Sequence, residues 1–158
     1  MTIQDNPSQD PALASVAQVE ALADQLSAAA DEIHARIMLD MKAYKERSAS
    51  PAEQALARGM LEDETILRQR ADGLYADAAT YVVKSLASSQ VALLGLTADA
   101  AEKIRKIEQL KDAAGLIGAL LMLAGAAATG QAAPIVVAIE RLGKQVKKIA
   151  PSAPNKAA

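Results

Sequence analysis

The stretch that decides the fold is residues 113–139, AAGLIGALLMLAGAAATGQAAPIVVAI. Its 27 residues include ten Leu, Ile, Val or Met, ten Ala and four Gly, and no Asp, Glu, Lys, Arg or His. Because apolar surface is driven out of water, this segment must be hidden. The sequence leaves three places open for it: a protein core, the surface of a partner, or a lipid bilayer.

The composition of the whole chain favours helices. Ala, Leu and Ile supply most of the apolar residues, whereas Phe, Trp and Cys are absent and Tyr occurs three times. Ala and Leu are strong helix formers, and the aromatic residues that favour strands are scarce. A chain of 158 residues is one domain by length and can bury a core. We therefore predict an all-α fold, an elongated helical bundle that holds by packing alone, without disulfides.

The first predicted helix starts with Asp10 as N-cap and Pro11 at the first helical position, where a missing N–H costs nothing. It should end near Arg47, which gives about 37 residues and roughly 55 Å. Its apolar residues repeat in steps of three and four, as in a coiled coil. These residues are Val19, Leu22, Leu26, Ala29, Ile33, Ile37, Met41 and Tyr44.

A second helix is predicted to begin with a capping box of Ser50 and Glu53, with Pro51 at the first helical position. It should run to Leu94 and end at Gly95. Its apolar face is made of Leu56, Met60, Leu67, Ala71, Leu74, Ala78 and Tyr81. Since the connection between the two helices is short, we expect a long antiparallel hairpin, each helix exceeding about 30 residues.

A third helix is predicted to start at Thr97 and to pass through the amphipathic residues 98–112 directly into the apolar stretch. Pro134 disfavours helix in the residue before it, so we place a turn or kink at 129–133. A short fourth helix should begin at Pro134 or Ile135 and end by Ile149. In this division, residues 1–9 form a disordered lead, 10–149 a single helical bundle domain, and 150–158 a disordered tail.

No catalytic, metal-binding or cofactor-binding pattern emerges, and we expect no enzyme, metal or cofactor. His34 is the only histidine, so Asp31 and His34 together fall short of the paired motifs of helical metal sites. Glu62, Asp63 and Glu64 point about 100° apart on a helix and are interpreted as a solvated face. Within that face, Glu64 should pair with Arg68 four residues later.

The predicted fourth helix is basic as well as amphipathic. Such a helix is typical of membrane-surface or partner binding, but cations near the C-terminus of an ordinary bundle helix are also favoured by the helix dipole. The basic flank consists of Lys111, Arg141, Lys144, Lys147 and Lys148. The net charge of the whole chain is −2, which argues against a nucleic-acid partner.

Residues 113–139 are long enough to cross a bilayer, at about 40 Å against a hydrocarbon core of about 30 Å. Ten strongly apolar residues provide only about −3 to −6 kcal/mol towards insertion, too little for a permanent anchor. Reversible insertion as a hairpin fits this energy better, with the cations that precede and follow the stretch on one side. The membrane-inserting residues of this hypothesis are Leu116, Ile117, Leu120, Leu121, Leu123, Ile135, Val136 and Ile139.

A long helical hairpin, an apolar helical hairpin and the lack of a basic and apolar signal segment near the start together resemble α-helical pore-forming toxins and the hydrophobic translocators of bacterial secretion systems. The resemblance concerns the layout of residues 11–149, with no shared motif. It implies a bundle made in the cytoplasm, exported without a signal peptide, that opens and inserts into a membrane. The alternative is an interaction protein that forms homo-oligomers, binds another helical protein, or coats a hydrophobic granule as phasins do.

Overall fold

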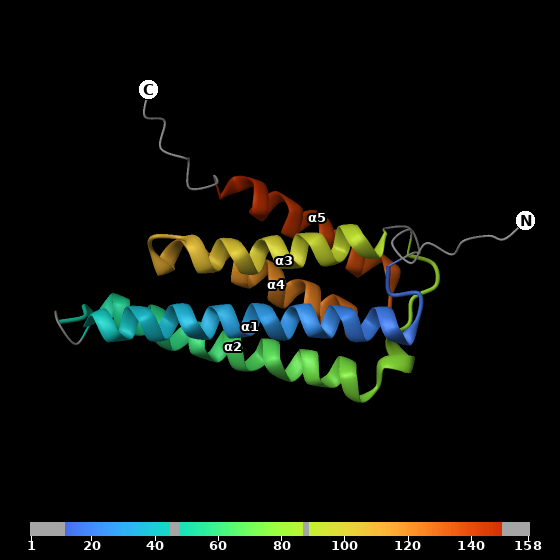
Figure 1. Ribbon diagram of the computed structural model, residues 1–158, viewed down its shortest axis with the longest axis horizontal. Helices are drawn as coiled ribbons and strands as arrows, with labels where there is room; N and C mark the ends of the chain where they lie inside the picture. The colour runs from blue at the N-terminus through green and yellow to red at the C-terminus, as the bar shows by residue number, and fades with distance from the viewer. Residues whose placement is uncertain (1–11, 45–47, 87–88, 150–158) are drawn as a thin grey trace, which may run out of the picture.

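The computed structural model describes residues 12–44, 48–86 and 89–149, and every element in these ranges is a helix. Figure 1 shows an elongated bundle, which confirms the predicted all-α fold. The longer helices lie roughly side by side, and α5 forms the outer layer at one edge. The elements are α1 (Val16–Tyr44), α2 (Pro51–Ala76), η1 (Ala78–Tyr81), α3 (Gln90–Lys106), η2 (Leu110–Ala113), α4 (Ala114–Ala127) and α5 (Ala132–Lys148).

The antiparallel hairpin of α1 and α2 is present as predicted, but both helices are shorter than expected. They contain 29 and 26 residues. The capping box is confirmed, because the Glu53 amide donates to Ser50 Oγ at 3.1 Å and the Ser50 amide donates to Glu53 Oε1 at 3.1 Å. The predicted cap at residues 10 and 11 and the end near residue 47 lie outside the described ranges.

The start of α1 at Val16 corrects the prediction. Leu13 has a φ of 63°, in the left-handed region, so no helix can run through it from Pro11. The carbonyl of Leu13 instead accepts the Val83 amide at 2.9 Å, and its amide donates to Gln90 Oε1 at 3.0 Å. These two bonds tie the entry to α1 to the segment that joins α2 to α3.

The prediction of one helix up to Leu94 was wrong. α2 ends at Ala76, and α3 begins at Gln90 with Ser89 as its N-cap. Gln90 is almost fully buried, and its side-chain amide also donates to the Gln18 carbonyl at 3.0 Å. Long-range hydrogen bonds of this kind stabilise a break between α2 and α3 that the spacing of apolar residues does not predict. Thr97, predicted as an N-cap, lies inside α3 and donates its hydroxyl to the Leu93 carbonyl at 2.9 Å.

The third predicted helix is also broken. α3 ends at Lys106, Ile107 is extended, and the chain reverses through η2 into α4. At the reversal the Arg36 guanidinium donates to the Glu108 carbonyl at 2.6 Å. The predicted turn after α4 is present, and Gly130 adopts a φ of +66° in it. Its predicted end was wrong, because α5 begins at Ala132, so Ala133 is helical although Pro134 follows it.

The packing of the bundle places α4 inside. α1 packs against α2 and α3, and α4 packs against α2 and α5. α5 lies on the outside, mainly against α4 and α3. Figure 1 shows α5 crossing the bundle obliquely, so its C-terminal end diverges from α3. The fold therefore consists of a three-helix frame, α1–α2–α3, and a hairpin, α4–α5, that reverses on itself.

Candidate functional site: an apolar hairpin with a cationic outer face

The α4–α5 hairpin contains all of the predicted membrane-inserting residues, and most of them are in the core. Leu116, Ile117, Leu120, Leu123 and Ile135 are buried, Leu121 and Ile139 are half-buried, and Val136 is exposed. One stretch of the described residues, Leu110–Ala127, is long and apolar enough to cross a membrane, and 56% of it is buried. In this structure just over half of that stretch is packed into the core, while Met122, Val136 and Val137 of the apolar segment are exposed.

Small residues bring the two helices of the hairpin close together. A methyl group placed on Gly115 would lie 2.5 Å from Gln145 Oε1, so the absence of a side chain there lets α5 approach α4. Further along, the buried alanines Ala119, Ala124 and Ala127 share the interior with larger aliphatic side chains. Close approach of this kind works in water and in lipid, because it depends on shape and not on solvent.

The outward face of α5 is cationic. Buried residues follow one line, Ile135, Ala138, Leu142 and Val146, and the opposite face is exposed. Four cations and the single acid Glu140 give α5 a net charge of +3 in a protein whose total is −2. Each member of the basic flank, Lys111, Arg141, Lys144, Lys147 and Lys148, is exposed to solvent.

The exposed face of α5 also carries apolar side chains. Val137 is 58% exposed and lies four residues before Arg141, so both belong to the same side of the helix. The next residues along that line are Lys144 and Lys148. The outer face thus runs from exposed valines near the turn to cations near the C-terminal end, which is the layout of a helix that lies on an anionic interface.

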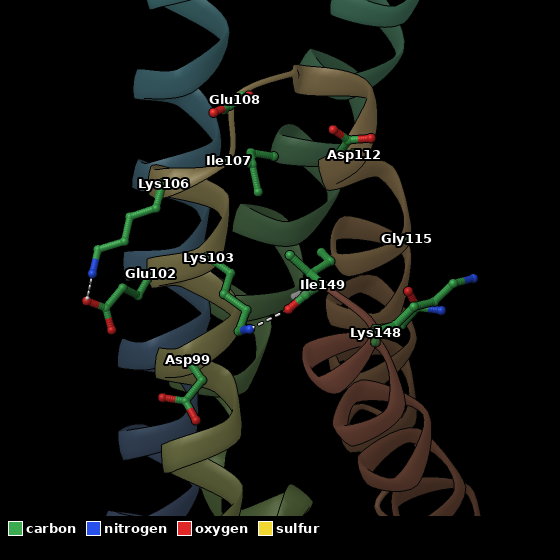
Figure 2. Close-up of a pocket in the computed structure, with 11 residues that line it drawn as sticks. Asp99, Glu102, Lys103, Lys106, Ile107, Glu108, Asp112, Gly115, Lys148 and Ile149 are labelled. Atoms are coloured by element: carbon green, nitrogen blue, oxygen red, sulfur yellow. Dashed lines mark hydrogen bonds and ion pairs between the residues drawn. The ribbon is translucent and has the colours of Figure 1, made fainter. Parts of the chain in front are cut away.

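A groove of about 790 Å³ opens where α5 diverges from α3, at the cationic end of the hairpin. Figure 2 shows the side chain of Lys103 reaching across this groove from α3. Its Nζ donates to the Ile149 carbonyl at 2.7 Å, just beyond the last residue of α5. Among the described residues, this is the one hydrogen bond from a side chain of the frame to α5.

The remaining charges of the groove are mixed in sign. Glu102 pairs with Lys106 at 2.9 Å on the outer side of α3, and this pairing lowers the pKa of Glu102 below its ordinary value. Asp99, Asp112 and Lys148 also line the groove. Because acids and cations alternate, the groove does not select one sign of ligand. Its position is what matters, since it marks where α5 is least covered by α3.

By contrast, the three-helix frame is joined by a network of polar bonds. His34 Nδ1 donates to Glu64 Oε1 at 2.5 Å, and Glu64 Oε2 accepts from Arg68 Nε at 3.0 Å. Arg68 also pairs with Asp31 at 2.8 Å, which returns the network from α2 to α1. These two carboxylates raise the pKa of Arg68, the hydrogen bond from Glu64 being the larger cause.

The network corrects one prediction and confirms another. Glu64 is 7% exposed and faces α1, so the solvated-face interpretation fails for this residue, while Glu62 beside it is exposed. The Glu64–Arg68 pair is confirmed. The contact with His34 was missed, although the sequence contained a signal: Glu64 lies between Met60 and Leu67 on the apolar face of α2.

The hairpin and the frame are therefore held in different ways. Further polar bonds within the frame join Tyr75 to Asp24, and Gln90 accepts from the Leu13 amide and donates to the Gln18 carbonyl at the start of α1. In the described part of the chain, the hairpin contributes no ion pair to the frame, and its contacts with the frame are apolar apart from the Lys103 bond. Apolar packing lacks directional bonds and can be exchanged for another apolar environment.

The described residues contain no group of three His, Cys, Asp or Glu that could hold a metal ion. Comparison with protein-family models, curated proteins and solved structures finds no match to this chain. The functional argument therefore depends on the hairpin itself.

Proposed function

We propose that this protein is a membrane-active helical bundle that binds an anionic bilayer through α5 and inserts the α4–α5 hairpin. The observation that carries the proposal is the attachment of the hairpin to the frame: apolar packing and one lysine bond, next to a frame joined by several polar bonds. On release, α1–α2–α3 keeps its polar cross-links and α4–α5 leaves as a unit. The proposed membrane binding and insertion involve no enzymatic step.

The free energies of the separate steps support reversible membrane binding. For α4 itself, moving from a protein core into hydrocarbon exchanges one apolar surrounding for another and is close to neutral, whereas the apolar surface of the frame that it uncovers opposes release. The favourable term comes from the cations, at about 1 kcal/mol for each Lys or Arg near an anionic surface. The net charge of +3 on α5 then provides about 3 kcal/mol, or about a hundredfold in binding. Such a protein would discriminate strongly between anionic and neutral membranes.

The test is to lock the hairpin onto the frame. The chain contains no Cys, so introduced pairs are the sole thiols. Gly143 of α5 faces Leu96 of α3, with Leu96 Cδ1 4.0 Å from the position of a β-carbon on Gly143. In the variant Leu96→Cys/Gly143→Cys, a short reducible bis-thiol reagent should tie α5 to α3. We expect the cross-linked protein to lose dye release from anionic vesicles and to regain it on reduction.

A matched control ties the hairpin to itself. Gly115→Cys/Gln145→Cys joins α4 to α5 where the Gln145 side chain lies against Gly115, with the same reagent and two cysteines, and leaves the frame untouched. This cross-link should preserve dye release. If both cross-linked proteins release dye as the unmodified chain does, the hairpin does not leave the frame and the proposal fails. If the unmodified chain neither binds nor permeabilises anionic vesicles, membrane activity itself is ruled out, which favours the alternative of a helical interaction protein.

A further inference from the structure

The end of the α1–α2 hairpin extends past α3 and α4 in Figure 1. The distal tip is defined here as residues 38–44 and 48–60. Ile37 is the last buried residue of α1, and Ala57 is the first buried residue of α2. The hydrogen bond from Arg36 to the Glu108 carbonyl marks the level along α1 at which the turn between α3 and α4 contacts it. Past this level, the described end of α1 extends beyond α3, whereas the first residue of α4, Ala114, still reaches α2.

This tip presents apolar side chains to solvent. Met38 is 39% exposed, Leu39 59% and Met41 41%. Met41 continues the line of Ile33 and Ile37, with the same step of four residues, so the stripe that packs α1 into the bundle extends past the bundle's end. The packing interface of α1 is therefore longer than the part of it that this chain covers. Methionine suits such a surface because its side chain adapts to the shape of a partner.

An apolar pocket of about 200 Å³ lies at the same end of the molecule, between α2 and the first residue of α4. Its lining residues are Ala55, Leu56, Gly59, Met60, Asp63 and Ala114. A β-carbon built on Gly59 would have no other atom within 4 Å, apart from its chain neighbours and its own helix backbone, so the missing side chain leaves open space. The tip thus combines projecting apolar side chains on α1 with a hollow on α2.

The charges of the two surfaces are complementary. Lys42 is exposed near the C-terminal end of α1, Asp63 lines the pocket on α2, and Glu62 beside it is exposed. Burial and the neighbouring Glu62 raise the pKa of Asp63 above its ordinary value, and among the described residues neither acid forms an ion pair. A second molecule related by a two-fold axis would bring each Lys42 towards the other molecule's acids.

We propose that the distal tip is a self-association surface, in which Met38 and Met41, three residues apart on one side of α1, pack against the Gly59 pocket of a second copy, and reciprocally, with Leu39 at the edge of the contact. A two-fold arrangement fits because the projecting and the hollow surfaces occur on the same tip. In this arrangement, α1 and α2 of each copy pack against the exposed end of the other copy's α1–α2 hairpin. The contact is small, so a weak dimer is expected.

The test fills the pocket without disturbing the monomer. Gly59→Leu places a side chain in the open space, and Gly73→Leu is the matched control, since Gly73 lies on the same helix and also has no atom within 4 Å of its built β-carbon. Leucine forms helices better than glycine, so both variants should fold. In sedimentation equilibrium, Gly59→Leu should raise the dimer dissociation constant at least about tenfold, and Gly73→Leu should leave it unchanged.

A second variant tests the projecting side. Leu39→Glu places a charge on an exposed position and should also weaken the dimer, with circular dichroism unchanged. A wild-type chain that stays monomeric at every concentration overturns the proposal, as does equal dimerisation of all four proteins. These measurements use no lipid. Their outcome is therefore separate from that of the vesicle experiments, which concern the other end of the chain.

Discussion

Glu64 is the residue on which the α1–α2 contact depends most. Its carboxylate is buried, and its two oxygens accept bonds from different helices, one from His34 on α1 and one from Arg68 on α2. A buried carboxylate is costly unless each oxygen is satisfied, and here both are. Its partners are more exposed, with side-chain accessibilities of 49% for His34 and 38% for Arg68.

Removing this carboxylate should destabilise the bundle. Glu64→Ala is expected to lower the free energy of unfolding by about 2 kcal/mol, because it breaks two hydrogen bonds to a charged group. Glu62→Ala, on an exposed neighbour, should change it by less than about 0.5 kcal/mol. Urea denaturation measures both values. Equal effects of the two substitutions would show that the network adds nothing to stability.

Alanine substitutions at two glycines of the α4–α5 hairpin distinguish the cost of backbone strain from the gain in helix propensity. Gly130, with a φ of +66°, occupies the turn, so Gly130→Ala should lower the free energy of unfolding by about 1 kcal/mol. Gly118 lies within α4 with open space around its built β-carbon, and Gly118→Ala should raise it by about 0.5–1 kcal/mol. Thermal unfolding should move the midpoints in opposite directions. A shift of the same sign in both variants would contradict the assigned turn.

At the scale of the elements, α5 is a helix held by few directional bonds among the described residues. Its outer face is free of other elements, and its C-terminal end is tied to α3 through Lys103 across the groove. Elements with few buried polar bonds open at lower free energy than the rest of a protein. The hairpin is therefore the first part of the described structure that should open.

Native-state hydrogen exchange should detect this opening. We expect the amides of α4 and α5 to exchange together, through an opening about 2 kcal/mol or more below that of α1 and α2. Lys103→Met should raise exchange chiefly in the last turns of α5, because it removes the bond to the Ile149 carbonyl and keeps most of the side chain's apolar stem. Exchange of all helices through one global opening would argue against a separable hairpin.

The whole molecule divides its charge unevenly. It is acidic in total, with a net charge of −2, yet α5 carries +3 on one exposed face. An anionic surface therefore attracts this face and repels the remainder, which orients the protein before any helix moves. The divided charge also explains why net charge alone is a poor guide to its partners.

Binding to anionic vesicles should weaken with salt. Raising the ionic strength from about 0.01 M to about 0.15 M shortens the screening length from roughly 30 Å to roughly 8 Å. Vesicle co-flotation should fall accordingly, and Lys144→Gln/Lys148→Gln should reduce both the binding at low salt and its salt dependence. Neutral vesicles serve as the control. Binding that is equal on neutral and anionic lipid would exclude attraction by α5 as its cause.

The sequence alone determined the helical fold, the α1–α2 hairpin, the capping box and the turn near residue 130. Each of these depends on neighbouring residues: the spacing of apolar side chains, the Ser50–Glu53 pair, and the low helix propensity around Gly130. It also identified the apolar segment and its basic flank, since composition shows both directly.

Only the tertiary structure decided where helices break and what hides the apolar segment. The breaks at residues 77–89 and 107–109 depend on Gln90, Val83 and Arg36, whose partners are about 70 or more residues away along the chain. The burial of Glu64 likewise depends on His34, 30 residues earlier. Local periodicity contains no information about such partners. For the same reason, the placement of α4 between α2 and α5 follows from packing that no single helix determines.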